Sequence, residues 1–306
     1  MARDVAAVVG EPGWITSAEL QQQVSARTIG TWVATGKLVL LRPGVYALPP
    51  VADGWRTRLA AALTRGNGVA SHVTALALWE LVEHPPGPVH VTVDLSRSAR
   101  GSCGVTVHRS AGIDDERRRV GSVSVTSVER SLVDSWARPA PLGRQDVRAA
   151  AITAVRRRQA SVRELGIELN RRPRLPGRAE LARLVGLLAD GCQSELEVWG
   201  CLNVLRGPGM PPFVQQRRVA VGGEVFVLDA AYDEVLLAVE MDGAAWHGSR
   251  QQRERDIRRD ALLATVGWQT LRFGHRRMTT APAGCRRDIR AAFTARQALF
   301  AGSSVR

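Results

Sequence analysis

The stretch that decides the fold of the C-terminal part is EVFVLDAAYDEVLLAVEMD, residues 224–242. Two runs of mainly apolar residues flank Asp233 and Glu234, and this pattern predicts a β-hairpin. The length of the loop determines which residues pair. We expect a two-residue loop, in which Tyr232 pairs with Val235.

This register brings acidic side chains together. Asp229 then pairs with Ala238, and side chains in a strand alternate between the two faces of the sheet. Glu240 and Asp242 therefore lie on the same face as Asp229. A change of one residue in the loop would move the second strand's carboxylates to the other face.

Three carboxylates on one face repel one another unless a cation offsets the repulsion. A hard divalent ion, Mg²⁺ or Mn²⁺, is the natural occupant of such an oxygen-rich site. A bound ion of this kind polarises a phosphoryl oxygen and lowers the pKa of a water molecule, which is the chemistry of phosphodiester hydrolysis. The alternative is that these acidic residues are simply solvated at the ends of a hairpin.

The flanking sequence predicts a layered α/β domain of helix, three strands, helix, strand and helix. The first helix begins at Ser194, and a charged helix follows the hairpin. The predicted elements are a helix from 194, strands at 214–221 and within 224–241, a helix at 252–266, a strand at 269–273 and a closing helix.

Three blocks in this region carry a family resemblance: VLDAAY from residue 227, LAVEMDGAAWH from 237 and RERDIRRDALLATVGWQTLRF from 253. In this order they resemble the very-short-patch-repair-endonuclease-like domain of unknown function in the PD-(D/E)XK superfamily. The resemblance spans Ser194 to Phe273. It implies a restriction-endonuclease-like α/β fold and a metal-dependent nuclease site.

The resemblance also implies roles for individual residues. Asp229 and Glu240 would hold the metal, assisted by the Met241 carbonyl, and Glu197 would complete or orient the site. His247 would act near the scissile phosphate. The helix residues assigned to positioning or to contacts with DNA are Arg253, Asp256, Arg259 and Asp260.

One position departs from the superfamily pattern. The lysine that gives the superfamily its K is Asp242 in this chain, as is usual for this subgroup, so the group that activates water has to be another. His247 is the candidate, because a neutral imidazole can accept a proton near neutral pH. The alternative is that His247 is a loop residue with a structural hydrogen bond.

The first 50 residues predict a different module. Three short helices, a turn at residues 42–44 and two strands follow one another. This is the order of a winged helix-turn-helix, in which the third helix enters the major groove of DNA. The predicted elements are helices at 4–9, 17–24 and 27–35, and strands at 37–41 and 45–48.

The segment LRPGVY, residues 41–46, resembles the wing of abortive-infection type IV antitoxins (AbiEi-like). On that resemblance the candidate DNA-facing residues are Arg27, Thr28, Thr31, Lys37 and, on the wing, Arg42. The alternative is a winged helix that binds protein, because residues 1–50 carry only four basic side chains against three acidic ones.

The remainder divides into a mixed α/β, antitoxin-like module at 51–138 and a helical linker region at 139–190, before the endonuclease-like domain at 191–306. In the middle module, we expect the histidines to be separate surface or core residues rather than members of one site. These residues, with a neighbouring carboxylate, are His72, His90, His108 and Asp134.

Composition limits the function classes. The net charge of +13, from 42 basic and 29 acidic residues, favours a polyanionic partner. Four scattered cysteines form no CxxC pair, which argues against a cysteine zinc site or a disulfide framework. With no secretory signal and no membrane-spanning run, we expect a cytoplasmic protein with no membrane partner.

These observations together predict a Mg²⁺- or Mn²⁺-dependent endonuclease of double-stranded DNA, guided or regulated by an N-terminal winged helix. The alternative is a DNA-binding regulator or antitoxin without catalysis, in which the carboxylates persist as elements of the fold. A toxin, or a repair or defence protein, would be a natural partner. A third alternative is a protein-interaction scaffold.

Overall fold

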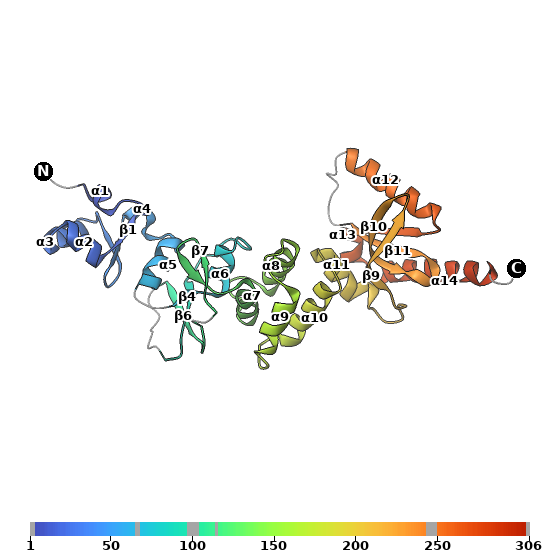
Figure 1. Cartoon of the computed structure of the whole chain (residues 1–306), viewed down its shortest axis with the longest axis horizontal. Coiled ribbons are helices and arrows are strands. Elements are labelled where there is room, and N and C mark those ends of the chain that lie inside the picture. Colours follow the sequence, from blue (N-terminus) through green and yellow to red (C-terminus); the bar gives the residue numbers. More distant parts are fainter. Residues whose placement is uncertain (1–3, 65–67, 97–103, 114–115, 243–249, 304–306) are drawn as a thin grey trace. The chain divides into compact units, whose positions relative to one another are not determined.

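The computed structural model describes residues 4–64, 68–96, 104–113, 116–242 and 250–303 (Figure 1). The chain divides into two compact units: residues 1–150 with 167–177, and residues 151–166 with 178–306. Within the described part of the chain, no helix combines the length and the apolar character that a membrane span requires.

The N-terminal unit begins with three short helices and a small sheet. A capping box starts the second helix, in which Thr16 and Glu19 satisfy each other's backbone amides, and Ser25 caps the third. The antiparallel strands lie in the order β1-β3-β2. The elements are α1 (Val5–Val9), β1 (Trp14–Thr16), α2 (Ser17–Gln23), α3 (Ala26–Ala34), β2 (Val39–Arg42) and β3 (Val45–Ala47).

A five-stranded sheet in the order β6-β5-β4-β8-β7 forms the middle of the N-terminal unit. Its apolar core contains Leu59 and Val91 among other buried residues. The strands are β4 (Val69–Ala70), β5 (Val89–Val93), β6 (Val105–Arg109), β7 (Arg118–Val120) and β8 (Val123–Val125). The helices are α4 (Pro49–Ala52), α5 (Trp55–Thr64), α6 (His72–Leu78) and α7 (Val128–Ala137).

Three helices follow along the chain: α8 (Arg144–Arg156), α9 (Val162–Asn170) and α10 (Arg178–Ala189). Helix α10 buries Leu181, Leu184, Leu187 and Leu188. This spacing of three and four residues is that of a helix with one apolar face.

The C-terminal unit contains a four-stranded sheet in the order β12-β11-β10-β9. The first three strands of this sheet in chain order, β9, β10 and β11, form an antiparallel meander, and α12 connects β11 to the parallel strand β12. The strands are β9 (Val214–Val221), β10 (Glu224–Tyr232), β11 (Leu237–Asp242) and β12 (Gln269–Gly274). The helices are α11 (Glu195–Gly200), η1 (Cys201–Leu205), η2 (Asp233–Val235), α12 (Arg250–Thr265), α13 (His275–Thr280) and α14 (Pro282–Ser303).

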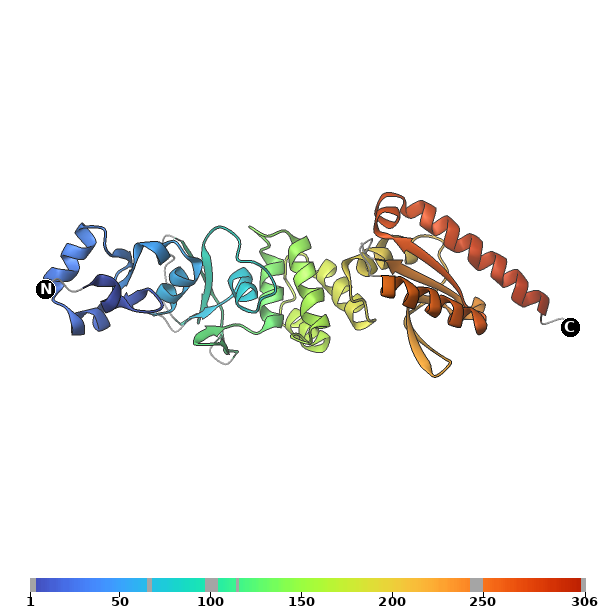
Figure 2. The ribbon, with the colours of Figure 1, turned by 90° about the horizontal axis from the view of Figure 1, so that it is seen from above.

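Figure 2 shows α14, at the red end of the chain, running alongside this sheet. One contact between them is the edge-to-face packing of Phe293 on Tyr232, with ring centroids 5.5 Å apart. The predicted order of helix, three strands, helix, strand and helix is confirmed.

The predicted hairpin loop was wrong in length. A turn of 3-10 helix and the left-handed residue Leu236, at φ 48°, connect the strands, so that Tyr232 pairs with Leu237 rather than Val235. Ala231 consequently pairs with Ala238. The register differs from the prediction by two positions, which preserves the alternation of faces.

Candidate active site

Two carboxylates lie opposite each other on neighbouring strands of the C-terminal sheet. Ala230 of β10 pairs with Val239 of β11, and the next step of this register places Asp229 opposite Glu240. Glu240 is buried, with 4% of its surface exposed. The Met241 amide donates a hydrogen bond of 2.8 Å to Asp229 Oδ2. The two residues that were predicted to hold a metal are thus brought together.

Glu197 joins them from the adjacent helix. Ser194 caps the N-terminus of α11 by accepting a hydrogen bond from the backbone amide of Glu197, whose side chain is buried. Glu197 Oε2 accepts hydrogen bonds from the Gln193 amide at 2.9 Å and from Gln216 Nε2 at 3.3 Å. Burial raises the pKa of Glu197, and the negative charge of Asp229 raises it further.

Two arginines balance part of this negative charge. Arg259 of α12 donates to Glu240 Oε1 at 2.7 Å and to the Val227 carbonyl at 2.7 Å. Arg272 of β12 bridges Asp260, at 2.9 Å, and Asp242, at 3.2 Å. Helix α12 therefore supplies both a cation and an anion to this face of the sheet.

Burial makes the carboxylates poor acids. Burial, together with the charge of Asp229, raises the pKa of Glu240 to about 8 despite its contact with Arg259. Burial also raises the pKa of Asp229 and of Glu197. A cation at this position would offset both causes, because it favours the charged form of each carboxylate.

Of the other residues predicted for this site, the structure describes the side chains of some and not of others. Asp242 is exposed and pairs with Arg272. Asp256 lies on α12 and is half-buried. His247 and the side chain of Arg253 lie outside the described residues, so their roles stay predictions.

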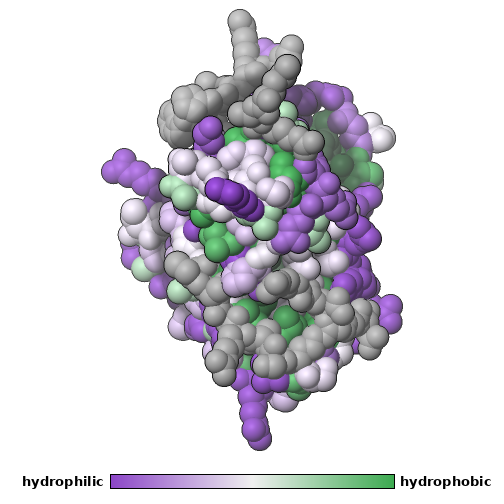
Figure 3. Space-filling model, turned by 90° about the vertical axis from the view of Figure 1, so that its left-hand side faces the viewer, coloured by the Kyte–Doolittle hydropathy of each residue, from purple (hydrophilic) through white to green (hydrophobic). Residues whose placement is uncertain are grey.

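The predicted DNA-facing residues of the N-terminal module differ in how far they are exposed to solvent. Arg27, Thr31 and Lys37 are exposed on α3 and just after it. The Thr28 side chain closes the cap of α3 with Ser25, at 2.9 Å. The end of the chain that carries these helices shows hydrophilic and apolar patches side by side (Figure 3).

Among the candidates for DNA contact in the N-terminal module, Arg42 is the one whose guanidinium group is already used in contacts within the protein. Its Nη1 donates to the carbonyls of Ala61 and Ala62, at 3.0 and 3.1 Å. The contact ties strand β2 to the end of helix α5. A phosphate contact by Arg42 stays a prediction that has to compete with this internal one.

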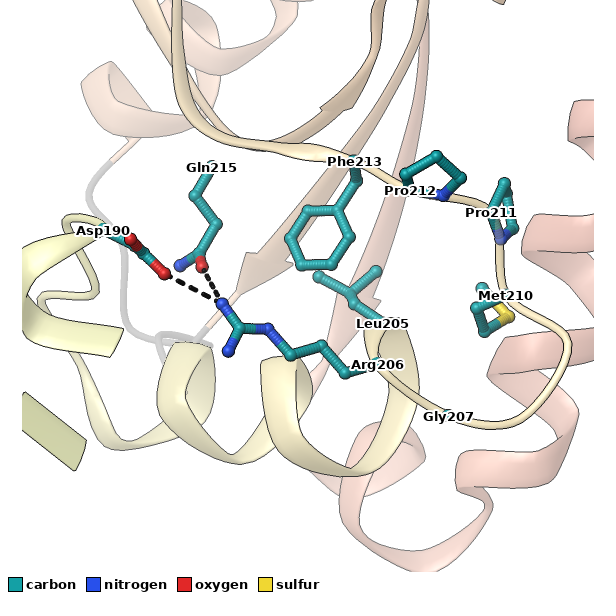
Figure 4. A pocket seen from close by; sticks show the side chains of 9 residues that line it. All are labelled: Asp190, Leu205, Arg206, Gly207, Met210, Pro211, Pro212, Phe213 and Gln215. Carbon is teal, nitrogen blue, oxygen red and sulfur yellow. Dashed lines mark hydrogen bonds and ion pairs between the residues drawn. The ribbon is translucent and has the colours of Figure 1, made fainter. Parts of the chain in front are cut away.

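The C-terminal unit has a separate pocket of about 740 Å³, shown in Figure 4. Arg206 crosses it and donates to Asp190 at 2.9 Å and to Gln215 at 3.1 Å. Phe213 and Met210 contribute apolar walls. None of the predicted site residues lines this pocket.

Sequence reasoning missed a cluster in the N-terminal unit. His72, His90 and His108, which we expected to be separate, lie together with their ring nitrogens within 4.8 Å of one another. The three histidines are therefore not separate, because strand pairing joins residues that are distant in the sequence, while the buried positions of His72 and His90 agree with the expectation of core residues. Asp134 takes part in ion pairs with Arg130 and Arg172 instead.

A known protein family matches the part of the chain that contains the C-terminal site. The family model REase_MTES_1575 matches residues 212–293. The chain therefore carries a restriction-endonuclease-like domain at its C-terminal end. This endonuclease-like domain contains Asp229, Glu240, Arg259 and Arg272, whereas Glu197 precedes the matched residues.

Two relatives from Mycobacterium tuberculosis match more of the chain. They are "Uncharacterized protein MT2308" of strain CDC 1551 / Oshkosh and "Uncharacterized protein Rv2248" of strain ATCC 25618 / H37Rv. Each is 28% identical over 241 residues, which cover 77% of this chain and 85% of the relative. The similarity thus extends well beyond the endonuclease-like domain.

A crystal structure of the RV2827C protein from Mycobacterium tuberculosis is also similar. It shares 17% identity over 61% of this chain and 78% of that chain, with a TM-score of 0.42. The N-terminal resemblance to AbiEi-like antitoxins stays a prediction.

Proposed function

We propose that this protein is a divalent-metal-dependent endonuclease that hydrolyses phosphodiester bonds of double-stranded DNA. The observation that carries the proposal is the pairing of Asp229 and Glu240 within a restriction-endonuclease-like domain. Both are acidic, both are shielded from solvent, and they project from neighbouring strands. A divalent cation that joins two such groups would offset their mutual repulsion.

The donor set fits a hard divalent ion. Asp229 and Glu240 offer carboxylate oxygens, which Mg²⁺ and Mn²⁺ prefer. The raised pKa of Glu240, about 8, marks the electrostatic cost of the site without a cation. Asp229 and Glu240 would hold the ion, with the Met241 carbonyl as the predicted third group. When bound, such an ion polarises the phosphate and makes a coordinated water a better nucleophile.

The chain's own residues have supporting roles in this proposal. Arg259 orients Glu240 and offers a positive charge to a phosphate oxygen. Arg272 holds Asp260 of α12 in place against the sheet. Glu197 keeps further negative charge near Asp229. His247 is proposed to move the proton to or from water.

The N-terminal module is proposed to bind duplex DNA. Its elements follow the order helix, strand, helix, helix and two-stranded wing, which is that of a winged helix-turn-helix. Helix α3 would then be the recognition helix, with Arg27 and Thr31 exposed on it. The net charge of +13 supports a polyanionic partner.

The proposal is tested by DNA cleavage. The full chain is incubated with supercoiled, linear, mismatched and single-stranded DNA, with Mg²⁺, with Mn²⁺ or with a chelator. We expect cutting of at least one duplex substrate that the chelator abolishes. Absence of cutting from every substrate, by a protein that is folded and binds DNA, would contradict the proposal.

A second function is favoured by one observation. Arg259 already neutralises Glu240 at 2.7 Å, and Arg272 already neutralises Asp242 at 3.2 Å. An internally neutralised cluster can persist as an element of the fold in a DNA-binding regulator or antitoxin. That protein would bind DNA tightly and tolerate uncharged amides at Asp229 and Glu240.

A further inference from the structure

The histidine cluster of the N-terminal unit is separate from the proposed nuclease site. His90 Nδ1 and His108 Nε2 lie 2.9 Å apart. The rings of His72 and His108 stack with centroids 3.7 Å apart, and those of His72 and His90 are 5.5 Å apart. One nitrogen from each residue lies within 4.8 Å of the others.

The pairing of β5 and β6 explains the convergence of two histidines. These neighbouring strands are parallel, with His90 opposite Thr106 and Thr92 opposite His108. Paired residues share a face, and residues two apart in a strand share a face. His90 and His108 therefore project from the same side of the sheet, one step apart.

His72 reaches this side from the start of α6. The Ser71 amide donates to the His90 carbonyl at 3.0 Å, which fixes the chain next to β5. His72 then adopts a left-handed backbone at φ 53°. That conformation is unfavourable for a residue with a Cβ, and it persists only where the surroundings impose it.

Hydroxyl groups form hydrogen bonds with two members of the cluster, His72 and His90. His72 Nδ1 lies 3.0 Å from Ser71 Oγ, which also accepts a 2.8 Å hydrogen bond from Thr92. The Thr74 hydroxyl accepts a hydrogen bond from the backbone amide of His90 at 2.9 Å, which holds the strand rather than the ring. Histidines that ligate metals use one ring nitrogen for the ion and the other for a hydrogen bond, as His72 Nδ1 has with Ser71 Oγ.

We propose that His72, His90 and His108 form a binding site for a transition-metal ion of the zinc class. Three imidazoles are a ligand set that suits Zn²⁺, Co²⁺, Ni²⁺ and Cu²⁺ rather than Mg²⁺. Two nitrogens on one tetrahedral zinc lie about 3.3 Å apart, so His90 and His108 need to separate only slightly. The stacked ring of His72 turns about its side-chain bonds to aim a nitrogen at the ion.

In the absence of a metal ion, Arg138 forms a hydrogen bond with His108. Its Nη1 lies 3.2 Å from His108 Nδ1, where it donates to a ring nitrogen without a proton. The proton of His108 is then on Nε2, facing His90. Coordination through Nε2 moves that proton to Nδ1, so Arg138 has to leave. Metal binding and the Arg138 contact exclude each other.

The test is metal binding by the full, metal-stripped chain. Co²⁺ is added and the visible absorbance of a nitrogen-ligated ion is followed, and Zn²⁺ is then used to displace it. We expect one such site per chain, with affinity reduced at least tenfold in His108→Gln and in His90→Gln. Absence of a Co²⁺ band that Zn²⁺ displaces, or an unchanged affinity in folded His108→Gln, would overturn the proposal.

Three further variants make the result specific. His275→Gln, which changes an exposed histidine of the other unit, should bind as the wild type does. Asp229→Asn combined with Glu240→Gln should also leave this site intact, which separates it from the nuclease site. Arg138→Ala should bind Co²⁺ at least as tightly as the wild type, whereas a tenfold loss would contradict the exclusion by Arg138. Circular dichroism of each metal-free variant checks that it is folded.

Discussion

Gly200 is a position at which helix α11 packs against a side chain of strand β11. A Cβ at this position would collide with Met241 Sδ and would lie 2.5 Å from Met278 Cε. The absence of a side chain therefore lets α11, which carries Glu197, lie against the strand that carries Glu240. The proposed site depends on this close approach.

Gly200→Ala is expected to give a free energy of unfolding about 1–3 kcal/mol lower than that of the control Gly186→Ala, because overpacking forces the ends of the two buried methionine side chains to move. Chemical denaturation measures the change. Gly186→Ala is the matched control, since that helical glycine has open space around its Cβ position. It should stabilise the protein by about 0.5–1 kcal/mol through helix propensity. Equal effects of the two substitutions would show that α11 does not pack as described.

The histidines make the metal-free protein sensitive to acid. Burial lowers the pKa of His90 and His108 from the ordinary 6.5 to about 4, and it lowers the pKa of His72 as well. Between these values the unfolded chain binds more protons than the folded one. The free energy of unfolding therefore falls as the pH decreases from about 6.5 to about 4.

Melting temperatures of the N-terminal transition, recorded with a chelator between pH 7 and pH 4, check this expectation. The decline should be smaller in His108→Gln, which removes one titrating group. His275→Gln should decline as the wild type does, because that histidine is exposed. A wild-type melting temperature that stays constant over this range would contradict the buried, neutral cluster.

Among the elements, helix α12 is the one that places a cation against the buried carboxylate of Glu240. Arg259 contacts Glu240, while its neighbour Arg258 is exposed and pairs with Glu224. An ion that binds Glu240 competes with the guanidinium of Arg259. The two adjacent arginines therefore provide a matched comparison.

Arg259→Ala is expected to lower, by several-fold, the Mn²⁺ concentration that gives half of the maximal thermal stabilisation. Arg258→Ala should leave this concentration unchanged. The rise of the melting temperature on addition of Mn²⁺ reports binding directly, since a ligand of the folded state stabilises it. If both substitutions had the same effect, general charge rather than competition at Glu240 would explain it.

The sequence predicted the hairpin and the shared face of Asp229 and Glu240 but not their register. Side chains in a strand alternate between faces with a period of two. The prediction that Asp229 and Glu240 share a face is therefore correct although the register differs by two positions. The turn itself depends on Leu236 in a left-handed conformation, which nothing in its residue type indicates. The contact between Arg259 and Glu240 was also beyond the sequence, because it joins α12 to β11.

The histidine cluster also could not be predicted, because it depends on strand pairing. The residues His72, His90 and His108 were visible in the sequence, but no local pattern indicates that β5 and β6 pair in parallel. Short elements were missed for a related reason. Strand β1 has three residues and β4 has two, too few for a periodic pattern.

In the whole molecule, the proposed function places DNA binding in the N-terminal module and chemistry in the C-terminal domain. The combined variant Arg27→Ala and Lys37→Ala should weaken duplex binding and reduce the slope of log affinity against log salt by about 2. Arg183→Ala, an exposed arginine on α10, is the charge control and should have little effect. Binding of DNA that is indifferent to Arg27 and Lys37 would exclude α3 as the recognition helix.

The most direct test of the central claim is a comparison of DNA cleavage by the wild type, Asp229→Asn, Glu240→Gln and Asp233→Asn. Asp233 is an exposed carboxylate on the loop of the same hairpin, and it pairs with Arg217. We expect the first two variants to lose at least about a hundredfold of the Mg²⁺- or Mn²⁺-dependent activity while remaining folded and bound to DNA. Asp233→Asn should cut as the wild type does. Full cutting by folded Asp229→Asn and Glu240→Gln would contradict the assignment of these two carboxylates to the active site.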